Sequence, residues 1–281
     1  MKLWGMFRYT VEEAIRKGTL IFYFVVSTII ILVFLFGISR SAEDAAQITM
    51  FGIPFLQGIG QNFNPVEFFL VMLQKQATSS ILLFGIFGVA GIIPSTLEKG
   101  TIDLFLSKPL SRAQILLFRA LGATVGVGLN IIYFVFGIWL VFGLKLGVWH
   151  WPFLCSSLLT VYAFACFYSL VVYVGLLTRS VGFSIILAFM FNLISAGLEW
   201  REQGLYRLWG NVVYHKALDV LYYVTPQLEA MLDNTSLFIG KMPVQMPNAP
   251  TEFHIMPFVY SFGSATLLYV LSVLYFKKQD F

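Results

Sequence analysis

The spacing of the charged residues is the feature that most constrains this chain. Six mostly apolar stretches of 19 to 33 residues contain no Asp, Glu, Lys or Arg. A helix that crosses a bilayer needs about 20 mostly apolar residues, because about 30 Å of hydrocarbon is covered at 1.5 Å per residue. Lipid offers the backbone no hydrogen-bond partners, so each stretch predicts one spanning helix. The stretches are Gly18–Ser39, Gln76–Leu97, Ala120–Leu144, Leu146–Thr178, Ser180–Leu198 and Phe253–Phe276.

Composition agrees with a protein whose main solvent is lipid. Of the 281 residues 58% are hydrophobic and 11% are charged, whereas an average soluble domain carries about 25% charged residues. This balance excludes a soluble enzyme and a disordered chain. A net charge of +4 without a Lys/Arg-rich run also excludes a nucleic-acid-binding protein, which needs a basic surface to contact the phosphates.

We therefore predict an all-α polytopic membrane protein with one transmembrane domain over residues 1–281. Its predicted parts are an interfacial helix at 1–19, spans at 20–38, 77–94, 117–141, 153–177, 181–198 and 257–276, a cytoplasmic corner at 95–115, and an outer segment with an interfacial helix at 199–256.

The Lys and Arg residues predict the orientation. If the N-terminus is cytoplasmic, eleven of them lie in inside segments and three in the short outside loops at Arg40, Lys75 and Lys145, as the positive-inside rule requires. We expect both termini in the cytoplasm and a location in the plasma (bacterial inner) membrane. The apolar core at 20–38 is too long for a signal peptide, whose core has about 7–15 residues.

The chain offers no energy source or enzyme chemistry of its own. The six stretches hold no Asp, Glu, Lys or Arg, the residues that ion-coupled transporters place at mid-membrane. There is no G-x-x-x-x-G-K-[ST], H-E-x-x-H or G-x-S-x-G motif, so neither an ATPase nor a hydrolase is predicted. Energy for active transport would have to come from another chain.

The N-terminal segment has the pattern of a helix lying on a membrane. Leu3, Phe7, Val11 and Ala14 recur at helical spacing and form one apolar stripe. The opposite face carries charges that we expect to pair as Glu12 with Arg16 and Glu13 with Lys17. An interfacial elbow that leads into the first span is predicted.

The corner between the second and third spans is dense in helix caps. Gly100 is placed to end the second span, and Thr101 to begin a short helix with Asp103 in its first turn. Pro109 ends that helix, and Ser111-x-x-Gln114 is a capping box for the next. The short helix carries Leu104 and Phe105, which suit a groove on a soluble partner.

The pattern Glu98-x-Gly100-Thr101-x-x-x-x-Leu106-x-x-Pro109-x-Ser111-Arg112 resembles the signature of ABC-2 type permeases, the membrane subunits of one class of ABC exporters. The order of segments around it is also similar, and the branch with nitrous-oxide-reductase maturation and gliding-motility permeases resembles it most. The resemblance is residue-specific only over 98–112.

The resemblance implies a six-span permease that pairs with a second permease copy, as a homodimer or heterodimer, and with a separate ABC ATPase. The ATPase would hold ATP and Mg²⁺, and this chain would hold no cofactor or metal. The interface with the ATPase would include Glu98, Gly100, Thr101, Asp103, Leu104, Phe105, Lys108, Pro109, Ser111 and Arg112. A non-transporting anchor or scaffold, and a channel, remain the alternatives.

Glycines in the second and third spans predict close helix packing. They are Gly85, Gly88, Gly91, Gly122 and Gly126. In the outer segment we expect an interfacial helix at about 203–223. Soft ligands gather there as Met231, Met242, Met246, His254 and Met256, which leaves a copper site open as a minor alternative.

Overall fold

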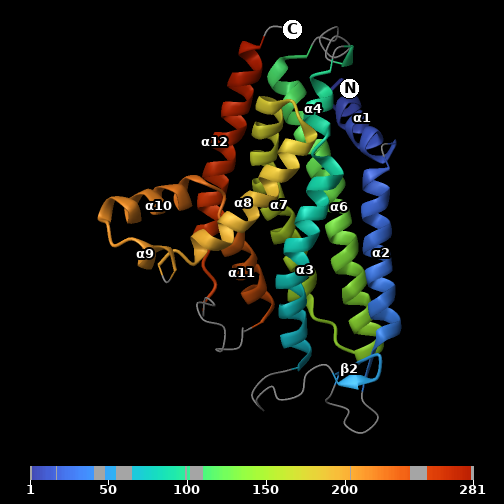
Figure 1. Ribbon diagram of the computed structural model, residues 1–281. Helices are drawn as coiled ribbons and strands as arrows, with labels where there is room; N and C mark the ends of the chain where they lie inside the picture. Colours follow the sequence, from blue (N-terminus) through green and yellow to red (C-terminus); the bar gives the residue numbers. More distant parts are fainter. Residues whose placement is uncertain are drawn as a thin grey trace.

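The computed structural model describes residues 2–16, 18–40, 48–54, 65–98, 100–101, 110–202, 204–240 and 252–279. Within them, six helical segments are long and apolar enough to cross a membrane. The chain is therefore a multi-pass, mainly helical membrane protein, as its charge spacing predicts. Both termini lie at one end of the helical bundle (Figure 1), which we call the terminal end; the other is the distal end.

Five of the six spanning segments lie within a few residues of their predicted positions. They are α2 (Thr19–Gly37), α6 (Arg112–Leu146), α7 (Trp151–Thr178), α8 (Val181–Glu199) and α12 (Met256–Lys278). A separate helix, α1 (Lys2–Arg16), precedes α2, and the chain turns between them at Gly18, whose φ is 72°. That positive φ suits glycine, which has no Cβ to clash.

The remaining span differs from its prediction. It was expected at 77–94, but α3 (Pro65–Val89) begins twelve residues earlier and is followed after a short break by α4 (Ile92–Thr96). The early start places Lys75 inside a candidate span rather than in a loop. The expectation that all six spans are free of charge is therefore wrong for this span. The Lys75 ammonium has a buried partner, which is described below.

The distal end carries a small antiparallel sheet that the sequence did not reveal. Its strands are β1 (Ile38–Arg40), β2 (Ile48–Met50) and β3 (Ile53–Pro54), in the order β1-β2-β3. Phe51 and Gly52 join β2 to β3 with φ of 54° and 79°. Positive φ at both loop residues is the requirement of a type I′ hairpin turn.

The segment between α8 and α12 has more structure than the single interfacial helix that was expected. It holds α9 (Leu205–Leu208), α10 (Val212–Val224) and α11 (Leu228–Ile239). In Figure 1, α9 and α10 form an arm that projects sideways from the bundle, with α10 beside α12. Helix α11 instead turns back into the bundle and packs against α3, α7 and α8.

The seam between α2 and α6 shows how small residues set the helix packing. A Cβ at Gly126 would lie 3.1 Å from Leu20 Cδ1, and one at Gly137 would lie 2.4 Å from Ile31 Cδ1. Between these contacts the buried Ser27 hydroxyl donates a 2.7 Å hydrogen bond to Asn130 Oδ1. Glycine therefore lets the two helices approach closely, and one polar pair fixes their register.

The other predicted packing glycines have different surroundings. A Cβ at Gly85 would lie 2.6 Å from Val127 Cγ1, so Gly85 is a close-packing residue inside this chain. At Gly88 and Gly91 the nearest side-chain atoms would lie 3.8 and 3.7 Å away, which is ordinary contact. Gly122 is buried in α6.

Candidate functional site

The structure describes the two flanks of the predicted corner at Glu98–Arg112, and both flanks lie at the terminal end. Glu98 is exposed, and the Thr101 N–H donates to its carbonyl at 3.1 Å. Asp103, Leu104, Phe105, Lys108 and Pro109 lie outside the described residues. The short helix predicted there therefore stays a prediction.

The first flank corrects one detail of the prediction. Helix α4 ends at Thr96, and the Leu97 N–H bonds the Pro94 carbonyl. Gly100 lies one turn further on, with a φ of 88°, so it forms the turn after the helix rather than its cap. This left-handed conformation still favours glycine, which has no Cβ.

The second flank confirms the predicted capping box. The Gln114 N–H donates to Ser111 Oγ at 3.2 Å, and the Ser111 N–H donates to Gln114 Oε1 at 3.0 Å. Two of the free N–H groups at the start of α6 are thereby satisfied. The capping box therefore fixes the residue at which α6 begins.

Arg112, the first residue of α6, holds the end of α12. Its Nη1 donates to the carbonyls of Phe276 and Lys277 at 3.4 and 3.3 Å, and also to that of Gln279. The last carbonyls of a helix have no partner within the helix, and a cation beside them complements the helix dipole. Arg112 therefore joins the start of α6 to the end of α12.

Seven residues further along α6, Arg119 is fully buried and forms the centre of a polar network. Its Nε donates to Thr96 Oγ1 at 2.9 Å and its Nη2 to the Ile92 carbonyl at 2.8 Å, both in α4. Its Nη1 forms an ion pair with Glu13 of α1. The other Glu13 oxygen accepts a 2.9 Å hydrogen bond from Ser95 Oγ.

This network changes the interpretation of α1. The sequence pattern placed Glu13 on the charged outer face, in a pair with Lys17, which lies outside the described residues. The structure shows that the Glu13 carboxylate pairs with Arg119. On the exposed side the observed pair is Arg8 with Glu12 at 2.7 Å, rather than Glu12 with Arg16. Thr10 and Ala14 are also buried, so one face of α1 packs on the bundle.

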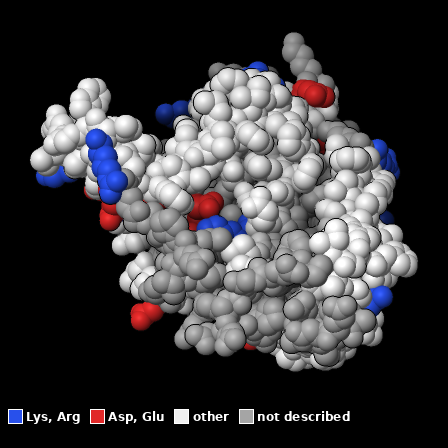
Figure 2. Space-filling view, turned by 60° about the horizontal axis from the view of Figure 1, so that its bottom comes forward, with Lys and Arg blue, Asp and Glu red and all other residues white. Residues whose placement is uncertain are grey.

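A second charge pair, with a buried acid and a half-buried base, lies between α3 and α11. Lys75 Nζ is 2.7 Å from Asp233 Oδ1, and the Asp233 side chain is 8% exposed. Beside Lys75 in sequence, the Gln74 amide donates to Thr160 Oγ1 of α7 at 2.9 Å. Figure 2, in which the distal end comes forward, shows acidic and basic atoms together in a hollow of that face.

Hydroxyl groups of neighbouring helices hold the start of α11. The Gln227 N–H donates to Ser261 Oγ of α12 at 2.9 Å, and the Glu229 N–H donates to Ser195 Oγ of α8 at 3.3 Å. Burial raises the pKa of the Glu229 carboxyl, the nearby Asp233 raises it further, and Lys75 opposes both. A helix with buried polar groups is thus fixed by hydroxyls and one ion pair.

The arm has its own polar centre. The Tyr206 hydroxyl and Arg201 Nε both donate to Asp219 Oδ1, at 2.5 and 3.0 Å. These two contacts lower the pKa of Asp219. The Arg201 guanidinium also lies 3.8 Å from the centroid of the Tyr222 ring, so α10 is held to the end of α8 by charge and by a cation–π contact.

The copper alternative gains no support from the described residues. Met231 is fully buried in α11, whereas Met256 is 57% exposed at the start of α12. Met242 and Met246 lie outside the described residues. Among the residues that are described, no group of three or more His, Cys, Asp or Glu side chains could hold a metal ion.

The fold and the site define a multi-pass helical membrane protein with buried polar joints. No family model matches the chain, and no curated protein matches it significantly.

Proposed function

We propose that this chain is the permease subunit of an ABC transporter of the ABC-2 type, and that it acts as an exporter. In this proposal it forms the translocation path with a second permease copy, and the termini are cytoplasmic. It draws energy from ATP and Mg²⁺ held in a separate nucleotide-binding subunit, and it carries no cofactor of its own.

The observation that carries the proposal is the anchoring around Glu98–Arg112. Arg112 and Arg119 lie seven residues apart on α6, and so on the same side of that helix. Arg112 bonds the end of α12, while Arg119 bonds α4 and α1. A force applied to the corner would therefore reach four helices at once, which is what an energy-receiving element needs.

The mechanism follows from these joints. When the ATPase subunits close on ATP, they would displace the corner, with Asp103 and Lys108 orienting it on the ATPase surface. A bundle interior is densely packed and does not deform continuously, so α1, α4, α6 and the end of α12 would move together. That movement would change the interface with the second permease copy and open or close the path.

The test is co-expression of this chain with a candidate ATPase from the same genomic neighbourhood. We expect Asp103→Lys or Lys108→Glu to reduce co-purification of the ATPase and its activity in lipid vesicles. The matched control is Lys145→Glu, an exposed charge reversal in the last turn of α6, which should change neither. Unchanged association in the corner variants would exclude the docking assignment. Ion flux that persists without any ATPase would favour a channel.

A further inference from the structure

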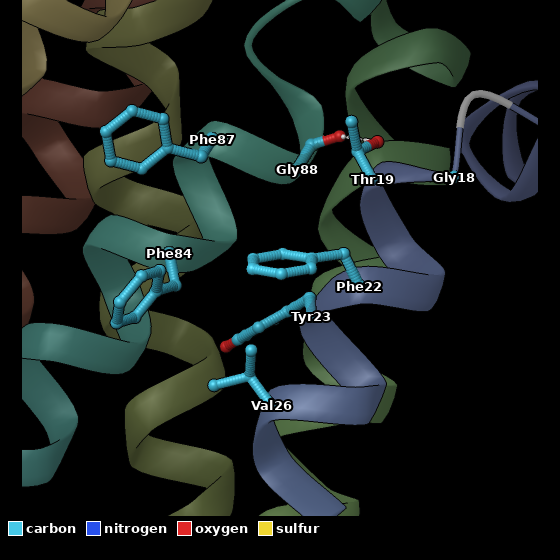
Figure 3. Close-up of a pocket in the computed structure, with 8 residues that line it drawn as sticks. All are labelled: Gly18, Thr19, Phe22, Tyr23, Val26, Phe84, Phe87 and Gly88. Carbon is cyan, nitrogen blue, oxygen red and sulfur yellow. Dashed lines mark hydrogen bonds between the residues drawn. The ribbon is translucent and has the colours of Figure 1, made fainter.

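An aromatic groove lies between α2 and α3, in the half of these helices nearest the terminal end. Its volume is about 510 Å³, within the roughly 300–1,000 Å³ of small-molecule sites. Figure 3 shows Phe22, Tyr23 and Val26 extending from α2 towards α3, with Phe84 and Phe87 on the α3 side. Phe22, Phe84 and Phe87 are 63%, 45% and 50% exposed, so the groove is open at the surface.

The groove offers a ligand almost no polar contact. Its two hydroxyl groups already donate within the bundle: Thr19 Oγ1 to the Gly88 carbonyl and Tyr23 Oη to the Ile81 carbonyl, both at 2.9 Å. A bound water needs two to four polar partners, and these donors are occupied. An empty space against the rings would forfeit dispersion contacts. Hydrocarbon is the occupant that satisfies both conditions.

The mouth of the groove adjoins a cation. Gly18 lines the groove, and Arg16 is two residues earlier, so their Cα atoms lie within about 7 Å of each other. Arg16 is exposed, and within the described part of the chain no ion pair engages it. Glu12 and Glu13 of the same helix line a second hollow together with Arg16, but their ion pairs are with Arg8 and Arg119.

We propose that this groove is a binding site for an anionic membrane phospholipid. One acyl chain lies between α2 and α3 against the rings of Phe22, Phe84 and Phe87, and the phosphate headgroup lies beside Arg16. The chemistry recognised is a flexible hydrocarbon chain joined to a negative headgroup, in the leaflet on the side of the termini. The site does not depend on the proposed transport function, because it needs no ATPase.

The test uses the full chain in lipid nanodiscs that contain a small fraction of phosphatidylglycerol with a photoactivatable group on one acyl chain. Labelled peptides are located by mass spectrometry. We expect labelling of 18–26 and 84–88 to exceed that of α12, where Val259 and Phe262 are equally open to lipid at 55% and 62% exposed. Even labelling of all lipid-facing helices would overturn the proposal.

Substitutions that fill the groove test whether the labelling reflects a specific binding site or ordinary contact with bulk lipid. Val26→Trp should reduce labelling of 84–88 severalfold, whereas Ile29→Trp, on the same helix at a position 54% exposed and outside the groove, should leave it unchanged. If Val26→Trp does not fold, Phe84→Trp fills the groove from a half-exposed ring. Equal labelling in the groove-filling and control variants would contradict the proposal.

The headgroup is tested by replacing the probe with phosphatidylcholine that carries the same acyl group. A cation near an anionic membrane surface contributes about 1 kcal/mol, so phosphatidylglycerol should label the groove about fivefold more strongly than phosphatidylcholine. Arg16→Gln, alone or with the neighbouring Lys17→Gln, should remove this preference. Equal labelling by both lipids in the unaltered chain would overturn the headgroup assignment. A groove shielded from both lipids while α12 is labelled would mean that a second copy of this chain covers it.

Discussion

At the scale of single residues, two charge pairs with a buried member distinguish this chain from a plain apolar bundle. Glu13 with Arg119 joins α1 to α6, and Lys75 with Asp233 joins α3 to α11. The sequence did not predict either pair, because the partners are far apart along the chain; Glu13 and Arg119 are separated by 106 positions. By contrast, the Ser111–Gln114 box was predictable, since its residues are three apart and the pattern alone defines it.

Replacing Arg119 by Met should destabilise the protein strongly. The change removes the partner of a mostly buried carboxylate, and the Thr96 hydroxyl and the Ile92 carbonyl each lose the hydrogen bond from Arg119. Breaking such a pair typically costs about 3–5 kcal/mol. Thermal unfolding of the purified protein in detergent measures the loss. The control is Arg8→Gln, since Arg8 and Glu12 are 72% and 42% exposed and such pairs contribute about 0–1 kcal/mol. Equal melting temperatures for both variants would contradict a structural role for Arg119.

Glu229 makes the stability of α11 depend on pH. Burial raises the pKa of this carboxyl in the folded state. A carboxyl with a raised folded pKa favours the folded state when protonated, so its contribution is lost as pH rises from the unfolded pKa of about 4.3 through the folded value. We expect Glu229→Gln to melt a few degrees higher than the unaltered chain at pH 7, with the difference disappearing near pH 4. Glu202→Gln, whose side chain is 73% exposed, serves as control. A lower melting temperature for Glu229→Gln at pH 7 would contradict the assignment.

At the scale of elements, the sequence predicted what depends on length and apolarity and missed what depends on burial of polar groups. Five spans lie where the charge-free stretches placed them, since lipid imposes their length. Helix α11 was not predicted because its Asp233, Asn234, Thr235 and Ser236 are typical of a loop, yet all are buried. Their hydroxyl and amide groups bond carbonyls one turn back in the same helix, a compensation that no periodicity shows.

Two glycines of α3, three residues apart, should respond oppositely to substitution. A Cβ at Gly85 would lie 2.6 Å from Val127 Cγ1 and 3.2 Å from Phe164, and overpacking typically costs about 1–3 kcal/mol. At Gly88 the nearest atom would lie 3.8 Å away, so Ala there should be neutral or stabilise slightly by restricting the unfolded chain. Thermal unfolding of Gly85→Ala and Gly88→Ala compares them directly. Equal changes in melting temperature would mean that the side chains of α6 and α7 move aside and accommodate the added methyl group at no cost.

At the scale of the whole molecule, the polar contacts between helices form two groups, one at the terminal end of the bundle and one around α11. The first two turns of α6 bind α1, α4 and the end of α12 at the terminal end. On the other side of the bundle, α11 is held between α3, α7 and α8. Among the described residues of the corner, Arg112 bonds the end of α12 in the first group. Movement received there would therefore act on the terminal end first and reach α11 through the lengths of the helices that pack against it, including α3, α7 and α12.

The orientation of the chain in the membrane decides whether the corner can meet a soluble ATPase. We predict that the terminal end faces the cytoplasm. The excess of Lys and Arg in segments of the terminal end favours the cytoplasm. In a background with Cys155 and Cys166 replaced, Lys278→Cys marks the terminal end and Phe51→Cys, 64% exposed in the turn after β2, marks the distal end. A maleimide that cannot cross the membrane should label Phe51→Cys in intact cells and Lys278→Cys only after the cells are opened. The reverse pattern would place the corner outside the cell, away from ATP, and would exclude the proposed function together with the predicted orientation.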